Sequence, residues 1–471
     1  MKLKDIPKRL SYILSAQWAR DATWTVFTIL LARHSPSVLG QIVLSLTYGY
    51  LVKTIVDVGL NDYLLSSFSR GESHPRQLLA EVTWLKTLVL FPVLLFLWYF
   101  TGQQQYTLEL RAIVLCIAGG LGLDAICDSF FALCQARGRQ DVEMRIRIPA
   151  ALFGIGFGIV CVLLHTSPLF IALYKPIESL LCLGCACLAL KRNPFAGFGI
   201  KGLLDLAQKM RSGLVFTGMA LCAMFYNKIN VIFLKRYGTD ADVGGFGVAW
   251  ETIEGISTLV SGALLGKVLF PILTRLWGEN KEAFCQLAGQ TARSLWAAAL
   301  PLIFLICVES DRFLPFVYGN AFTTAVTSQQ LLTPCLATAF LHNLAAYAMI
   351  GMRQHVLLFW MYFSGLIINV ICCFVIIPLK PLEGAALTLT ITKVWVALLT
   401  VSYFQWKAKP MTFFQWLLML GAGGASIFLW SVTGAYLPRE CAECIGLIPL
   451  LALFWYWRPP APYEKTSSPK S

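Results

Sequence analysis

The chain has 471 residues, of which 57% are hydrophobic and only 13% are charged, and its mean hydropathy is +0.67. Soluble domains carry roughly a quarter charged residues, so this composition excludes a soluble protein and predicts one whose solvent is lipid. The formal net charge is +13, and its distribution along the chain decides whether it indicates nucleic acid or a membrane surface.

Fourteen apolar runs, bounded by charged, proline or glycine turns, have the length expected of membrane-spanning helices, which need roughly 20 residues. The first run carries Trp18, Arg20 and Asp21 and lacks a small-residue cleavage site, which favours a span over a signal peptide. The sequence therefore predicts an all-α polytopic membrane protein of about fourteen transmembrane helices. The runs cover residues 10–33, 38–61, 79–101, 108–135, 148–166, 168–190, 211–234, 243–272, 291–310, 325–350, 355–379, 383–405, 411–436 and 441–457.

Basic residues alternate between the predicted loops. With the N-terminus inside, about 24 of the 38 lysines and arginines fall in cytoplasmic segments, about 7 in outer loops and 7 within spans. This asymmetry is the positive-inside pattern, and it predicts an inner-membrane protein with both termini in the cytoplasm. Anionic membrane lipids are then the partners of the charge of +13, and nucleic acid is not needed to explain it.

The two halves of the chain resemble each other faintly at an offset of six spans. Val38-Leu39-Gly40 and Val243-Gly244-Gly245 lie 205 residues apart, and Arg70 and Arg275 keep that offset. An even shift gives both copies the same orientation, as in transporters built from parallel repeats. The predicted parts are an N-lobe of spans 1–6 (1–190), a cytoplasmic inter-lobe loop (191–210), a C-lobe of spans 7–12 (211–405), two extra C-terminal spans (406–458) and a cytoplasmic tail (459–471).

Several short segments between about residues 10 and 405 share a pattern of glycine, proline and apolar positions. They are Ala32–Gly40 (ARHSPSVLG), Asp57–Leu60 (DVGL), Asn230–Leu234 (NVIFL), Val243–Ala249 (VGGFGVA), Leu269–Arg275 (LFPILTR), Phe316–Gly319 (FVYG) and Glu383–Ala386 (EGAA). In combination they resemble the polysaccharide transporters, or O-antigen flippases, of the multidrug/oligosaccharidyl-lipid/polysaccharide (MOP) exporter superfamily.

This resemblance implies two six-helix lobes around a central cavity, two additional C-terminal helices, and alternating access driven by an ion gradient. It also implies the cargo, an undecaprenyl-pyrophosphate-linked oligosaccharide unit for O-antigen or exopolysaccharide assembly. The implied partners are this lipid-linked substrate and the polysaccharide polymerase machinery.

Ionisable side chains inside the spans are the best indicators of a site, because a charge at the membrane centre costs roughly 2.5–3.5 kcal/mol. Lys53 and Asp57 are spaced to neutralise each other on one helix face, as are Lys175 and Glu178, and for both pairs an ion pair and a ligand site stay open. Cationic side chains can bind the negative charge of a pyrophosphate, and the Asn227 amide can donate to sugar hydroxyls. A position at a solvent-facing helix end explains the presence of Asn227 nearly as well. The predicted substrate-binding residues are Arg20, Lys53, Lys228, Asn227 and Lys393.

Carboxylates within the spans are the candidates for ion or proton coupling. Asp124 with Asp128, and Glu251 with Glu254, form like-charge pairs on one helix face, where repulsion favours a proton on one member. An absence of any coupling role for Glu251 and Glu254 is equally consistent with the sequence, because a position in water at the outer end of the eighth span would also explain two neighbouring acids. The predicted coupling residues are Asp21, Asp57, Asp124, Asp128, Glu251 and Glu254.

The sequence contains no Walker A motif, metal cluster or catalytic constellation, so neither an enzyme nor a cofactor is predicted. Cys441 and Cys444 have ligand-like spacing, but without further ligands a metal site is not expected. Two alternatives stay open: a MOP exporter of another substrate, such as drugs or lipid II, and a membrane-embedded glycan polymerase or ligase. Short predicted outer loops and five unclustered histidines disfavour the polymerase or ligase.

Overall fold

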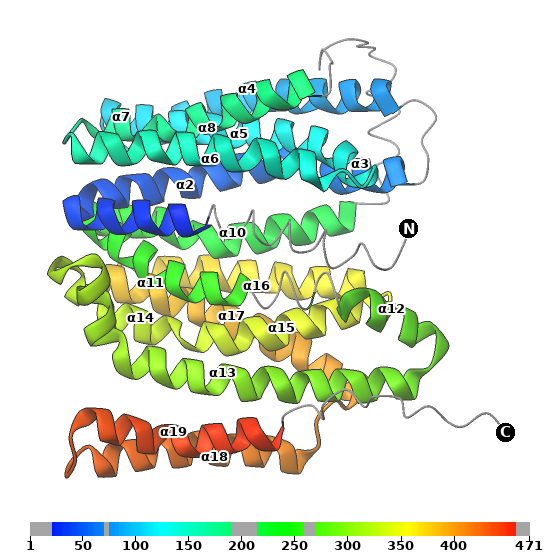
Figure 1. Ribbon diagram of the computed structural model, residues 1–471, viewed down its shortest axis with the longest axis vertical. Helices are drawn as coiled ribbons and strands as arrows, with labels where there is room; N and C mark the ends of the chain where they lie inside the picture. Colours follow the sequence, from blue (N-terminus) through cyan, green and yellow to red (C-terminus); the bar gives the residue numbers. More distant parts are fainter. Residues whose placement is uncertain (1–20, 70–74, 190–213, 259–264, 266–268, 458–471) are drawn as a thin grey trace. The chain divides into compact units, whose positions relative to one another are not determined.

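The computed structural model describes residues 21–69, 75–189, 214–258, 265 and 269–457, and all regular elements in those parts are helices. The chain divides into two compact units, each described by itself below, and Figure 1 gives the helix labels. Unit 1 comprises Met1–Val248, Leu314–Ala325 and Leu366–Thr388; unit 2 comprises Ala249–Phe313, Val326–Gly365 and Leu389–Ser471.

Unit 1 is built around α5, which packs against α2, α3, α4 and α8, while α2 also contacts α10. Figure 1 shows these long helices running side by side. The helices of unit 1 are residues 21–34, α2 (Pro36–Asp57), α3 (Leu60–Ser69), α4 (Pro75–Gln103), α5 (Leu108–Ala136), α6 (Gln140–Leu163), α7 (Pro168–Ala172), α8 (Tyr174–Ala189), α10 (Leu214–Tyr237), the first part of α11 (Asp240–Thr258) and the 3-10 helix η4 (Asn320–Ala325).

Local sequence signals explain how these helices start and how closely they approach. Ser35 interrupts the first helix, and its Oγ accepts a hydrogen bond from the backbone N–H of Val38, so α2 begins with a capped first turn. Glycines then bring α8 close to its neighbours: a Cβ built on Gly120 of α5 would lie 3.0 Å from the backbone of Lys175, and one on Gly154 of α6 would lie 2.8 Å from the Tyr174 carbonyl oxygen. This close packing brings the polar residues of α8 against α5.

Unit 2 ends in an antiparallel hairpin of α18 and α19, which lie side by side in Figure 1. A capping box between Thr412 and Gln415 starts α18. The helices α11, α13, α16 and α17 contribute residues to both units. The helices of unit 2 are the last part of α11, α12 (Phe270–Glu279), α13 (Lys281–Tyr318), α14 (Val326–Leu332), α15 (Pro334–Gly351), α16 (His355–Val375), α17 (Pro381–Ala408), α18 (Phe413–Thr433) and α19 (Arg439–Tyr456).

Eleven helices in the described parts are long and apolar enough to cross a membrane, so the predicted count of fourteen is not confirmed. The first and eighth predicted spans, 10–33 and 243–272, lie partly outside the described residues. The fourteenth corresponds to α19, whose first two turns carry Arg439, Glu440 and Glu443. The lobe boundaries at 190 and 405 stay a prediction.

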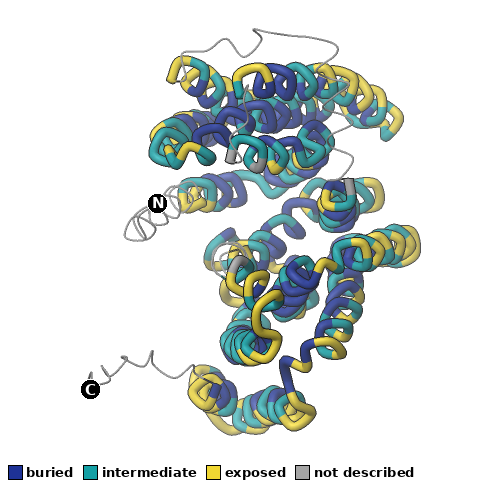
Figure 2. The backbone as a smooth tube through the Cα atoms, turned by 90° about the vertical axis from the view of Figure 1, so that its right-hand side faces the viewer, coloured by how far each residue is buried: buried dark blue, intermediate teal, exposed yellow. Residues whose placement is uncertain are grey.

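Large apolar side chains cover the outside of the helices. Phe91, Leu188 and Phe413 are 76–80% exposed, and Figure 2 shows exposed and buried residues alternating along the helices. Exposed apolar side chains on this scale are expected where the solvent is lipid, because lipid tails are apolar too. The helical backbone suits this environment, since it satisfies its hydrogen bonds internally. The chain is a multi-pass membrane protein.

Candidate functional site

A polar cavity of about 200 Å³ lies inside unit 1. Asp21 and Trp24 of the first helix face it, together with residues of α2, α5, α6 and α8. Three carboxylates and two ammonium groups are among the described lining residues, although the surrounding helices are apolar. The remaining lining residues are Leu46, Tyr50, Lys53, Leu121, Asp124, Ile155, Tyr174, Lys175 and Glu178.

Lys175 is the centre of one ion cluster in this cavity. Its Nζ lies 2.7 Å from Asp124 and 2.9 Å from Glu178, and all three side chains are at most 15% exposed. The predicted pairing of Lys175 with Glu178 is therefore confirmed, and Asp124 joins it from α5. One lysine shared by two carboxylates leaves this cluster with a formal negative charge.

A second cluster surrounds Asp128. Lys53 on α2 approaches its carboxylate to 2.8 Å, and Arg147 on α6 pairs with the other oxygen. Arg147 also lies 2.9 Å from Glu143. The repulsion expected between Asp124 and Asp128 is thus offset, because each acid has its own cation on a neighbouring helix.

Lys86 on α4 forms the third cluster and has no exposed surface. Its Nζ donates hydrogen bonds of 2.7 Å to Asp57, to the Asn61 side chain and to the Ala125 carbonyl oxygen. The pairing of Lys53 with Asp57 along α2 is therefore not the arrangement in the structure. Both residues find partners on other helices, which spacing along one helix does not reveal.

Aromatic side chains complete the cavity. Trp24 and Tyr174 pack around Phe27, with ring centroids 5.1–6.0 Å apart. The Nζ of Lys228 on α10 lies 5.2 Å from the centre of the Tyr50 ring, which lines the cavity. The amide of Asn227 donates to the Ala223 carbonyl oxygen at 2.8 Å, within its own helix.

The structure thus gathers several sequence-predicted residues in unit 1. Asp21, Lys53 and Asp124 line the cavity, and Asp128 and Lys228 each contact a lining residue. Arg20 lies outside the described residues. Lys175 and Glu178 were predicted only as a possible ion pair or ligand site along one helix. Lys86, within the predicted span 79–101, and Arg147, just before the predicted span 148–166, were not predicted to belong to the site.

The remaining predicted residues belong to unit 2. The Nζ of Lys393 on α17 lies 4.7 Å from the centre of the Trp250 ring. Glu251 and Glu254 are half-buried on α11. His342, which no sequence pattern singled out, has its two ring nitrogens 3.0 Å from the hydroxyls of Thr400 and Tyr362.

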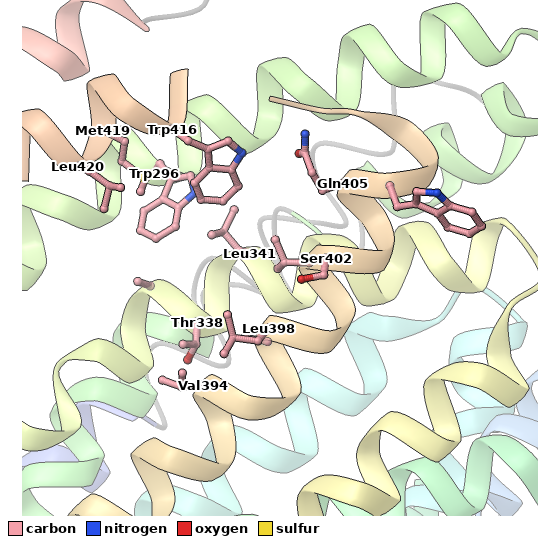
Figure 3. A pocket seen from close by; sticks show the side chains of 14 residues that line it. Trp296, Thr338, Leu341, Val394, Leu398, Ser402, Gln405, Trp416, Met419 and Leu420 are labelled. Atoms are coloured by element: carbon pink, nitrogen blue, oxygen red, sulfur yellow. The ribbon is translucent and has the colours of Figure 1, made fainter. Parts of the chain in front are cut away.

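An apolar pocket of about 640 Å³ in unit 2 was not predicted. It lies between α13, α15, α17 and α18, and Figure 3 shows Trp296 and Trp416 together at one end, with centroids 6.1 Å apart. Its lining residues carry no charge, and the polar ones include Ser402 and Gln405. Contacts between helices distant in sequence form this pocket, so hydropathy alone does not indicate it.

Among the described residues, no group of three or more His, Cys, Asp or Glu side chains is placed to hold a metal ion. Cys441 and Cys444 are exposed free thiols.

Comparison with solved structures shows the fold. The lipid II flippase MurJ in an inward closed conformation is 11% identical, with a TM-score of 0.70 over 94% of this chain and 96% of that one. A multidrug resistance MATE transporter of the MOP superfamily, facing inward, is 12% identical, with a TM-score of 0.63 over 83% and 94%. A Vibrio cholerae MATE transporter is 11% identical, with a TM-score of 0.52 over 85% and 98%.

Comparison of sequences shows the family. None of the curated proteins compared with the chain matches it. The family model described as polysaccharide biosynthesis protein matches residues 30–327, which is more than half of the chain. The chain therefore belongs to the polysaccharide biosynthesis protein family and has the fold of MurJ and the MATE transporters, as the resemblance in its sequence predicted.

Proposed function

We propose that this protein is a flippase, not an enzyme, that moves undecaprenyl-pyrophosphate-linked oligosaccharide units across the bacterial inner membrane. The units would serve O-antigen or exopolysaccharide assembly, with polymerase machinery downstream, and both termini would be cytoplasmic. Family membership and the fold shared with MurJ and the MATE transporters support a transporter of this kind. The polar cavity inside an apolar helix bundle is the observation that carries the proposal.

The cavity residues are suited to a charged and hydroxyl-rich headgroup. Lys53 is bound to the Asp128 carboxylate, which a phosphate can replace with similar geometry. Trp24 and Tyr50 also line the cavity, and aromatic side chains of this kind can pack against the apolar side of a sugar. Keeping such groups inside a membrane protein is costly, which favours a role in transport over a purely structural one.

Shared ion pairs supply a route to ion coupling. The Lys175 ammonium is bound by Asp124 and Glu178 together, so protonation of either acid weakens the binding of the ammonium. A released ammonium then binds substrate phosphate. Proton uptake and substrate binding would favour each other, and this reciprocity is what coupling to a proton gradient requires.

The apolar pocket of unit 2 suits the lipid part of the substrate. Its volume of about 640 Å³ and uncharged lining match a polyprenyl chain rather than a headgroup.

The test is translocation of a fluorescent lipid-linked oligosaccharide in proteoliposomes. Lys53→Gln and Lys228→Gln should each slow translocation by at least about tenfold, because each removes a charge-assisted contact worth roughly 1.5–3 kcal/mol. Lys380→Gln is the matched control, since Lys380 is 75% exposed and pairs only with Glu383 among the described residues. Wild-type rates in both cavity variants would refute the proposal, and transport of lipid II or drugs instead would favour another MOP cargo.

A further inference from the structure

A second cavity in unit 2 lies between α13 and the α18–α19 hairpin and has a volume of about 910 Å³. It is distinct from the pocket proposed for the polyprenyl chain and shares none of its lining residues. Apolar side chains such as Phe304, Ile427 and Leu450 line most of it, whereas Asp311 and Arg439 lie at one end.

The dimensions of this groove match one leaflet of a bilayer. Its lining on α13 runs from Leu300 to Asp311, which is about 16 Å at the helical rise of about 1.5 Å per residue. The hydrocarbon core of a bilayer is about 30 Å thick, so the groove reaches roughly to its middle. An elongated apolar groove of this depth, with charges at one end, has the shape of a phospholipid acyl chain below its headgroup.

The charged end is a network between α13 and α19. Arg439 donates to both oxygens of Asp311 at 2.7 and 2.6 Å and to Glu443 at 2.8 Å, while Arg312 lies 3.0 Å from Glu440. We call this network the α13–α19 charge cluster. Its members are Glu309, Asp311, Arg312, Arg439, Glu440 and Glu443.

Four acids and two arginines give the α13–α19 charge cluster a formal charge of −2. Glu440 and Asp311 are its most exposed acids, with side chains 67% and 47% exposed. The Arg312 guanidinium lies 3.0 Å from the Glu440 carboxylate and supports its negative charge. A headgroup at this end of the groove therefore meets an excess of negative charge.

We propose that the groove is a binding site for a phospholipid with an ammonium headgroup, phosphatidylethanolamine. The ammonium pairs with Glu440 and Asp311, the lipid phosphate lies by Arg312, and one acyl chain fills the groove. An anionic phospholipid, or a prenyl pyrophosphate, brings only negative charge to a cluster that already has an excess of it. The bound lipid then helps to fasten the α18–α19 hairpin to α13.

Two adjacent glycines of α18 provide a matched pair of variants. Gly423 lines the groove, whereas Gly424 is exposed and does not, and a Cβ built on either meets nothing within 4 Å. Gly423→Leu should displace part of the acyl chain, while Gly424→Leu gains the same helix propensity outside the groove. Glu440→Gln alters the headgroup end at an exposed position where folding is not at risk.

The measurement is the midpoint of thermal unfolding of the purified full chain in detergent, titrated with dioleoyl phosphatidylethanolamine, dioleoyl phosphatidylglycerol or undecaprenyl phosphate. Wild type and Gly424→Leu should be stabilised by phosphatidylethanolamine at lower concentrations than by the other two lipids. Gly423→Leu should need at least about tenfold more phosphatidylethanolamine, since excluding two methylenes costs about that factor. Glu440→Gln should reduce the difference between the concentrations of phosphatidylethanolamine and phosphatidylglycerol that are needed for the same stabilisation.

Three results would overturn the proposal. The first is equal or stronger stabilisation of the wild type by phosphatidylglycerol, and the second is an unchanged phosphatidylethanolamine titration in Gly423→Leu. The third is that Gly423→Leu loses binding of undecaprenyl phosphate and not of phosphatidylethanolamine. The last result would assign the groove to the substrate chain. None of these titrations depends on transport activity, so the lipid site and the proposed flippase function are tested separately.

Discussion

Lys86 is the most completely enclosed charge among the described residues. Its three ammonium hydrogens are satisfied by Asp57, Asn61 and the Ala125 carbonyl oxygen, so removing the ammonium leaves the Asp57 carboxylate without this buried counter-ion. Breaking a buried ion pair from one side costs about 3–5 kcal/mol. We expect Lys86→Met to lower the free energy of unfolding by that amount, measured by thermal unfolding in detergent.

Two further variants separate loss of the ion pair from loss of packing. Adding Asp57→Asn to Lys86→Met removes the stranded carboxylate and should restore part of the stability. Arg275→Ala, which breaks an exposed pair with Glu279, should change the free energy of unfolding by at most about 1 kcal/mol. A Lys86→Met protein as stable as Arg275→Ala would contradict this account.

At the residue scale, the sequence indicated which charges gather but not how they pair. An ionisable side chain in an apolar run is conspicuous, and Asp21, Lys53 and Asp124, which this criterion selected, line the polar cavity. Their roles in substrate binding and ion coupling stay a prediction. A same-helix ion pair is worth only about 0.2–0.5 kcal/mol, and cross-helix partners therefore prevail over it. Arg147 was placed in a loop because the predicted span begins at residue 148, whereas α6 begins at Gln140.

At the element scale, the crossing of α2 with the start of α11 depends on glycine. A Cβ on Gly40 would overlap the Asp240 carbonyl oxygen, and one on Gly244 would lie 3.3 Å from the backbone nitrogen of Gly40. These are the glycine segments that the sequence repeat matched. Gly40→Ala has to push the helices apart, and overpacking of this kind costs about 1–3 kcal/mol. We expect a lower unfolding midpoint in detergent.

The matched control for the crossing is Gly119→Ala on α5. A Cβ there meets nothing within 4 Å, so the substitution should be neutral or slightly stabilising through helix propensity. Equal unfolding midpoints for Gly40→Ala and Gly119→Ala would show that the helices do not meet as closely as described.

Hydropathy located the elements well because each span is an apolar run, but it detected only their apolar parts. The run 291–310 lies within α13, which extends from Lys281 to Tyr318 with polar residues at both ends. The run 168–190 contains two helices, α7 and α8, divided at Leu173. Such helix extensions and breaks depend on neighbouring helices, which hydropathy does not include.

At the scale of the whole molecule, contacts inside each unit join chain segments that the basic residues assign to the same side of the membrane. In unit 1, the rings of His34 and His165, both predicted outside, are 4.8 Å apart, and the Thr217 hydroxyl donates to the Val58 carbonyl oxygen at the predicted inner side. In unit 2, Arg439 meets Asp311, both predicted outside. The alternation of the predicted spans is therefore consistent with the packing of each unit.

Reporter fusions test the absolute orientation and the disputed last span together. With the N-terminus inside, a truncation after Lys409 should make fused green fluorescent protein fluoresce, and one after Leu437 should make fused alkaline phosphatase active. The reverse pattern would overturn the orientation.

A fusion after Trp457 then decides whether α19 crosses the membrane despite Arg439, Glu440 and Glu443 in its first two turns. Charges near a helix end cost far less than charges at its centre, and Arg439 is paired with both Asp311 and Glu443. We therefore expect fluorescence after Trp457, whereas phosphatase activity there would leave α19 outside the membrane and the C-terminus on the outer side.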